Sequence, residues 1–212
     1  MGRDDPAKRQ RKAALPQRRP DQRPRGALDQ SLRRSTGRRA VRSQTSTGGS
    51  RHGPPEFVYT TYIRTSPERL WQALTDPAFT RRYWGAVLTT DWKPGSEMTW
   101  EYAGATVRDP EQVVLEAEPH RRLSYTWQAV TPEFAKAVGF DDDYLAKVVA
   151  EPRSKVTFEL EPVGEVVKLT VVHDGFDPGS ATLESVSQGW PWILSALKSL
   201  LETDEPLPVS LG

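Results

Sequence analysis

The chain has 212 residues, and its 29 Lys and Arg residues almost balance its 28 Asp and Glu residues. It contains no cysteine, which excludes disulfides, thiolate nucleophiles and cysteine-based zinc or iron–sulfur sites. No apolar run approaches the roughly 20 residues of a membrane-spanning helix, and the N-terminus has no apolar segment typical of a secretory signal. We therefore expect a cytoplasmic protein.

The balanced total hides two regions of opposite charge. Residues 1–52 hold 15 Lys and Arg against 4 Asp and Glu, whereas the remainder holds 14 against 24. Residues 1–55 are rich in Arg, Pro, Gln, Ser and Gly, without a hydrophobic period, and such a segment cannot bury enough surface to fold. We expect a disordered basic arm. It is a nucleic-acid-binding arm acting through residues 1–52, a solvated tail, or the product of a start codon assigned too early.

Regular elements begin at Phe57. The stretch "EFVYTTYIRT" alternates with a period of two, which predicts a strand. Ser66 is placed to cap a helix that begins at Pro67, and Asp76-Pro77 opens a second short helix. Six further strand-like segments follow, separated by turn signals: "AVLTTDW", "EMTWEYA", "EQVVLEAEP", "RRLSYTWQ", "KVTFELEP" and "EVVKLTVVHDGF".

The last predicted element is a helix from about Ser180 to Glu202. Apolar residues recur along it at helical spacing and form one stripe, comprising Val186, Trp190, Ile193, Leu197 and Leu200/Leu201. Trp190 should therefore face the sheet, and Trp192 should lie toward the flank. Pro191 lacks a backbone N–H, so we expect a kink there, which either leaves space for a pocket beneath the N-terminal half of the helix or serves packing alone.

The order of elements predicts an α+β fold. Alternation over successive hairpins indicates an antiparallel sheet of about seven strands with one solvated face, two short helices after the first strand, and a long C-terminal helix on the dry face. The domain spans 56–203, and 204–212 form a short C-terminal tail.

Several stretches resemble one superfamily. These are "TSPERLWQALTDP", "RRYWG", "AEPHRRLSYTW", "KVTFELEPVGEVVKLTVVHDGF" and "GWPWILSALKSLLE". They resemble the SRPBCC (START-like, helix-grip) superfamily, and within it the branch named after the C-terminal domain of the activator of the heat-shock-protein-ninety ATPase. The resemblance implies a helix-grip fold, in which a curved sheet wraps around the last helix and a hydrophobic ligand is held between them.

An insert departs from this pattern at about 131–153. Relatives usually have a shorter link there, and the insert contains two apolar-periodic pieces, "FAKAV" and "YLAKVV". The stretch "DDDY" at 141–144 lacks calcium-ligand spacing and is better interpreted as a helix cap. Three roles for the insert are compatible with the sequence: a lid over the cavity, a surface that binds a partner, or an extension without a function.

Large aromatic side chains on the inward faces are the main functional hint, because Tyr and Trp combine apolar rings with polar tips. The candidate cavity residues are Trp100, Tyr102, Tyr125, Trp127, Phe158, His173, Val186, Trp190, Ile193 and Leu194. The alternative is an ordinary core of large residues. His173 continues the inward stripe of the last strand and is a weak catalytic candidate, although such a histidine is more often a satisfied edge residue. His52 lies in the arm and His120 in a turn.

The expected function is therefore binding of a hydrophobic or aromatic small molecule, lipid-like or polyketide-like, without metal or cofactor. One rival is an enzyme of the polyketide cyclase/aromatase kind that uses His173 and pocket tyrosines for proton transfer. A second rival, implied by the family name, is a co-chaperone-like module whose partner is a heat-shock ATPase.

Overall fold

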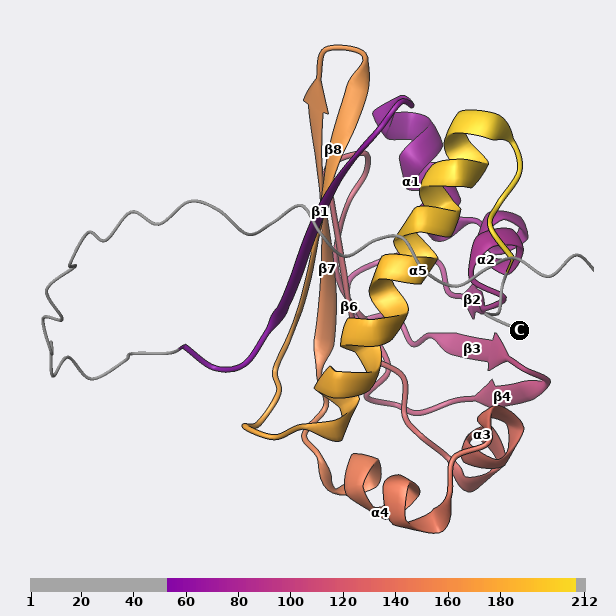
Figure 1. Ribbon diagram of the computed structural model, residues 1–212, viewed down its shortest axis with the longest axis vertical. Helices are drawn as coiled ribbons and strands as arrows, with labels where there is room; N and C mark the ends of the chain where they lie inside the picture. Colours follow the sequence, from indigo (N-terminus) through magenta and orange to yellow (C-terminus); the bar gives the residue numbers. More distant parts are fainter. Residues whose placement is uncertain (1–52, 209–212) are drawn as a thin grey trace, which may run out of the picture. The chain divides into compact units, whose positions relative to one another are not determined.

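The computed structural model describes residues 53–208, so the predicted arm lies outside the described residues except for 53–55. The elements run in the order β1 (Phe57–Ile63), α1 (Pro67–Thr75), α2 (Pro77–Tyr83), β2 (Val87–Thr89), β3 (Thr99–Tyr102), β4 (Ala105–Val107), β5 (Val114–Glu118), β6 (Arg122–Thr126), α3 (Pro132–Val138), α4 (Asp142–Ala150), β7 (Lys155–Val163), β8 (Val166–Asp174) and α5 (Ala181–Thr203). The predicted α+β helix-grip architecture is confirmed (Figure 1). Within the described range, no helix has the length and apolar character needed to cross a bilayer.

The strands form two antiparallel sheets that are joined at one edge. One sheet has the order β1-β8-β7-β6-β5 and the other the order β2-β3-β4. Backbone hydrogen bonds connect the sheets, from Met98 N to Gln112 O (2.7 Å) and from Val114 N to Ser96 O (3.0 Å). The short strands cross the long ones at a large angle (Figure 1), so the connected sheets curve around the helices.

Strand β4 was not expected from the sequence. Tyr102 pairs with Ala105 across a two-residue turn, in which Ala103 (φ 50°) and Gly104 (φ 84°) both have positive φ. Such a turn matches the twist of a hairpin, but it is usually signalled by Asn-Gly or Asp-Gly. The following strand has only three residues, too few to show alternation.

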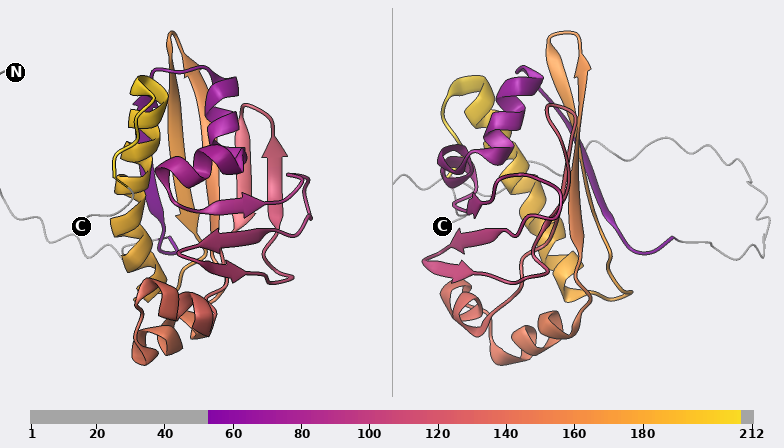
Figure 2. Two further views of the ribbon diagram at one scale, coloured as in Figure 1. Left: turned by 90° about the vertical axis from the view of Figure 1, so that its right-hand side faces the viewer. Right: turned by 180° about the vertical axis from the view of Figure 1, so that it is seen from behind.

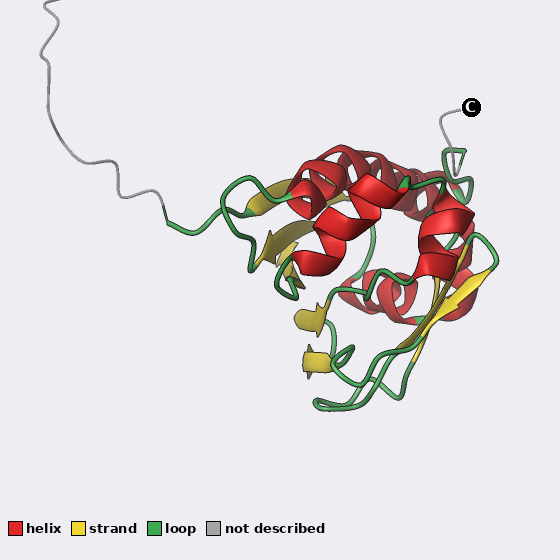
Figure 3. Cartoon of the chain, turned by 90° about the horizontal axis from the view of Figure 1, so that it is seen from below, coloured by secondary structure: helices red, strands yellow, loops and turns green. Residues whose placement is uncertain are grey.

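The helices cover one face of the five-stranded sheet, and no helix of the described chain covers the other (Figure 2). Seen from below, strands lie at the left and at the lower right, and the helices lie above and between them (Figure 3). The inward positions of β8 are buried as predicted; they are Val167, Leu169, Val171 and His173. The core therefore lies between this sheet and α5.

Helix α5 begins after Ser180, whose hydroxyl accepts from Leu183 N (2.9 Å), and remains one element through Pro191. Trp190 is only 2 % exposed, whereas Trp192 is partly exposed and its indole donates to Pro208 O (2.9 Å). The predicted directions of the two tryptophans are confirmed. A kink at Pro191 stays a prediction.

Candidate ligand cavity

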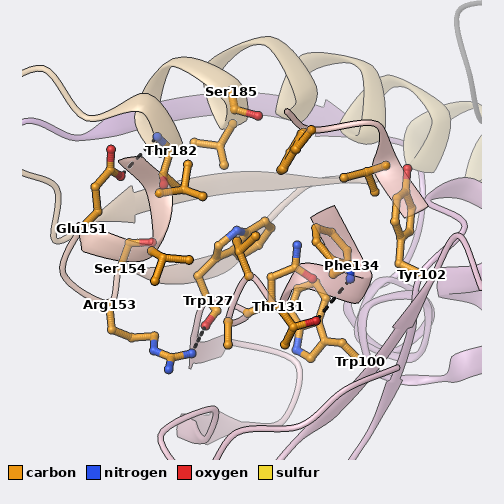
Figure 4. Close-up of a pocket in the computed structure, with 18 of the residues that line it drawn as sticks. Trp100, Tyr102, Trp127, Thr131, Phe134, Glu151, Arg153, Ser154, Thr182 and Ser185 are labelled. Carbon is orange, nitrogen blue, oxygen red and sulfur yellow. Dashed lines mark hydrogen bonds between the residues drawn. The ribbon is translucent and has the colours of Figure 1, made fainter. Parts of the chain in front are cut away.

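A cavity of about 710 Å³ lies between α5, β3 and the segment from Trp127 to Ser154 (Figure 4). From α5 it is lined by Thr182, Ser185, Val186, Gly189, Trp190 and Ile193. The insert contributes residues of both α3 and α4, and the sheet contributes Trp100 and Tyr102. Its volume lies in the range of small-molecule sites.

Four tryptophans form one wall of the cavity. Trp84, Trp100, Trp127 and Trp190 come from four separate segments, and five of their ring pairs have centroid distances of 5.1 to 5.9 Å. Aromatic pairs at this spacing contribute roughly 0.5–1.5 kcal/mol beyond the area that they bury. Trp127 is the member of the cluster that stays partly exposed. The cluster is therefore a stable aromatic wall.

The insert supplies an opposing apolar wall. The ring centroids of Phe134 and Phe140 are 6.3 Å apart, and those of Phe140 and Tyr144 are 4.6 Å apart. Local signals explain both helices: Thr131 caps α3, and Asp141 Oδ1 accepts from Tyr144 N (2.7 Å), which confirms the capping role predicted for "DDDY". The insert is thus part of the cavity wall.

Two charged residues fix the segment that follows α4. Glu151 accepts hydrogen bonds from Ser180 Oγ (2.7 Å), Ala181 N (2.6 Å) and Thr182 N (3.2 Å), and so ties the insert to the start of α5 (Figure 4). Partial burial raises the pKa of Glu151, but these hydrogen bonds outweigh it, so that the pKa lies below its usual value. The carboxylate also complements the positive end of the helix dipole.

Arg153 connects the same segment to the sheet. It donates to Trp127 O (3.1 Å) and to Asp109 Oδ1 (2.8 Å), and the carboxylate of Glu111 lies 3.7 Å from its guanidinium. Its charge is therefore already balanced by the chain itself. This residue positions Trp127 and does not offer a free cation to a ligand.

His173 is a buried, fully bonded residue behind the cavity. It is 0 % exposed; its Nδ1 lies 3.1 Å from Trp190 Nε1 and its Nε2 lies 3.0 Å from Ser154 Oγ. Burial lowers the pKa of His173 to about 3. An indole N–H can only donate, so Nδ1 accepts, and the neutral ring carries its proton on Nε2. His173 therefore holds Trp190 and Ser154 in place.

The predicted cavity residues fall into two groups. Six of them line the cavity: Trp100, Tyr102, Trp127, Val186, Trp190 and Ile193. The other four belong to the core behind it and are Tyr125, Phe158, His173 and Leu194. Alternation and helical spacing identify the inward face, but they do not distinguish side chains that border a space from side chains that fill it.

Several lining residues were not singled out from the sequence. The insert residues Phe134, Phe140 and Tyr144 lay within noted apolar pieces, but nothing in their spacing indicated which side they face. Trp84 ends the second short helix, and its 9 % exposure follows from tertiary packing. Ser154 carried no signal, because its role depends on a histidine 19 positions away.

The comparisons with known proteins agree with this architecture. Residues 64–202 match the family model described as "Activator of Hsp90 ATPase homolog 1-like protein". The chain belongs to this family. No curated protein matches the chain. Among solved structures, protein MLL2253 from Mesorhizobium loti is 28% identical, with a TM-score of 0.54 over 69% of this chain and 96% of that one.

Two more distant structures show the fold alone. The Aha1 dimer from Colwellia psychrerythraea is 17% identical, with a TM-score of 0.53 over 70% of this chain and 97% of that one. CalU16 from Micromonospora echinospora is 21% identical, with a TM-score of 0.51 over 72% and 77%. Membership in the activator family thus rests on the family model, and the arrangement of the strands and helices is shared with these structures.

Proposed function

We propose that this member of the activator family binds a hydrophobic or aromatic small molecule in the cytoplasm, within the cavity between α5 and the insert. The observation that carries the proposal is the aromatic cavity of about 710 Å³, with tryptophans on one wall and insert aromatics on the other. Aromatic faces bind flat apolar ligands through dispersion and burial of apolar surface.

The arrangement gives less support to acid–base catalysis. His173 was the candidate proton carrier, but it does not line the cavity, and its ring nitrogens face Ser154 and Trp190 rather than a carboxylate. A base with a pKa of about 3 is far below the pKa that suits proton transfer near neutral pH. Binding therefore remains the function that the cavity supports best.

Gly189 provides a direct test, because it lines the cavity and a Cβ added there meets no atom within 4 Å. Gly189→Leu should fill part of the cavity without loss of stability, since leucine favours a helix more than glycine. We expect its Kd for 2-acetylnaphthalene, measured by equilibrium dialysis, to rise at least tenfold. Gln188→Leu is the matched control, since Gln188 is exposed on the same helix and does not line the cavity.

Native mass spectrometry of protein purified from its own host should also detect a retained small molecule in the wild type and less of it in Gly189→Leu. Equal probe affinity in wild type and Gly189→Leu would place binding elsewhere. Absence of binding to the wild type would refute the proposed function.

Family membership favours a second candidate, a co-chaperone-like module that stimulates a heat-shock ATPase. The supporting observation is the match of residues 64–202 to the family model. An ATPase assay with the host's own Hsp90 tests it. Stimulation that saturates with added protein, and that persists in Gly189→Leu, would favour this candidate over ligand binding. An unchanged ATPase rate would remove it.

A further inference from the structure

Two residues of the cavity wall carry buried polar atoms that have no partner within the described chain. These are Trp100 Nε1, a donor, and Gln128 Oε1, an acceptor, and both residues line the cavity. Trp100 is 2 % exposed, so its N–H is removed from bulk water. Buried polar groups in folded proteins nearly always have a hydrogen-bond partner. Two such atoms in one cavity wall therefore point to a ligand with complementary polar atoms.

A third polar group is built into the wall behind the insert. Trp190 donates to His173 Nδ1, so the proton of His173 lies on Nε2 and is donated to Ser154 Oγ. Ser154 Oγ accepts this bond, and its own hydroxyl proton remains available to another acceptor. Ser154 is only 4 % exposed and lines the cavity. This chain of hydrogen bonds from Trp190 through His173 to Ser154, called the relay below, leaves the Ser154 hydroxyl as a donor.

The two donors lie on either side of Trp127. The Trp127 ring centroid is 5.1 Å from that of Trp100 and 4.7 Å from that of His173, which holds Ser154. Figure 4 shows Trp127 between Ser154 and Trp100. Because Trp127 is the partly exposed member of the cluster, a ligand ring that packs against it has a hydrogen-bond donor on each side.

We propose that the cavity selects aromatic molecules that carry carbonyl or phenol oxygens, and that Ser154 Oγ–H and Trp100 Nε1–H each donate to one such oxygen on their own side of the ligand ring. Gln128 Oε1 accepts from a ligand hydroxyl where one is present. The inference rests on the proposed binding function. It adds the chemical class of the ligand and the residues that recognise its polar atoms. Purely hydrocarbon ligands leave these polar groups unpaired and bind more weakly.

The test compares two probes of similar shape and opposite polarity. 2-Acetylnaphthalene carries a carbonyl oxygen, and 2-isopropylnaphthalene carries a methyl group in its place. A neutral hydrogen bond changes Kd by about three- to tenfold, so a carbonyl oxygen that meets one of the donors should give the wild type a preference of at least about threefold for the ketone in equilibrium dialysis. This comparison uses only the unmodified protein and does not depend on any variant being folded.

Variants then assign the donors. We expect Ser154→Ala or Trp100→Phe, whichever removes the donor that the ketone meets, to reduce the ketone preference at least threefold. The measured quantity is the ratio of the two Kd values, because Trp100→Phe also removes ring surface from the cavity wall. Trp100→Phe does not touch the relay and therefore checks Ser154→Ala, which removes the acceptor of His173 Nε2–H. Ser185→Ala is the matched control, because Ser185 lines the cavity from α5 and has no part in the relay.

The outcomes separate the two proposals. Equal Kd values for ketone and hydrocarbon in the wild type, or a ketone preference unchanged in both variants, would overturn this inference and leave the binding function standing. If neither probe binds to the wild type, the binding function fails, and the inference fails with it.

Discussion

Replacing His173 with Gln should remove a specific part of the pH dependence of stability. The native pKa is about 3, well below the usual 6.5, because the ring is buried. Between these values the unfolded chain binds a proton that the native protein does not, so stability is present above pH 6.5 and is lost as the pH falls. From pH 7 to pH 5, this residue alone should lower the free energy of unfolding of the wild type by about 2 kcal/mol.

The variant suits this measurement because Gln retains one acceptor and one donor, as the neutral His173 ring does toward Trp190 and Ser154. Urea unfolding followed by circular dichroism at pH 7, 6 and 5 gives the free energy of each protein. The other titrating groups are common to both, so the difference in pH slope reports His173. Parallel slopes, or an NMR titration of the His173 ring in the native wild type above pH 5, would refute the assignment of a neutral buried histidine.

Two further predictions concern the attachment of α5. Trp190→Ala should lower the free energy of unfolding by about 3–5 kcal/mol, because Trp190 packs against Trp84, Trp127 and Phe158. The control Trp192→Ala should lower it less. Equal losses of the two variants in urea unfolding would contradict the assigned helix face. Glu151→Ala removes three hydrogen bonds at the start of α5 and should cost about 0.5–2 kcal/mol; exposed Glu184→Ala is the control, and an unchanged unfolding midpoint in Glu151→Ala would show that the cap does not hold the insert to the helix.

The fold could be predicted because its signals are local. Alternation in β7 and β8 identified the inward residues, as with Val156 and Phe158, and the helical spacing of apolar residues located α5 from about Ser180 to Glu202. The short strand β4 was missed because its turn uses Ala103-Gly104 and three residues cannot show a period. The division into two sheets was also not predicted, because backbone pairing between 96–98 and 112–114 leaves no mark on the hydrophobic pattern.

The site was less predictable because it depends on contacts between distant segments. Helical spacing placed Trp190 on the inner face of α5, but it could not show that the indole bonds to His173. Likewise, His173 was expected to line the cavity because it continues an inward stripe. The structure leaves His173 outside the cavity lining and bonds it to two residues that do line the cavity, Ser154 and Trp190, so the histidine supports the cavity wall.

The two halves of α5 serve different purposes, which explains why the insert matters for the cavity. From Leu194 onward, the inward residues Leu194, Leu197 and Leu200 are fully packed core, and the helix end is tied down by the ion pair between Arg69 and Asp204 (2.7 Å). The half before Leu194 borders the cavity, so it lacks that continuous packing on its inner face. Tyr144, which donates to Ala181 O (3.2 Å), and Glu151 supply the missing attachment from the insert. The insert thus both closes the cavity and holds the helix that lines it. Shortening the insert would therefore open the cavity wall and also loosen the start of α5.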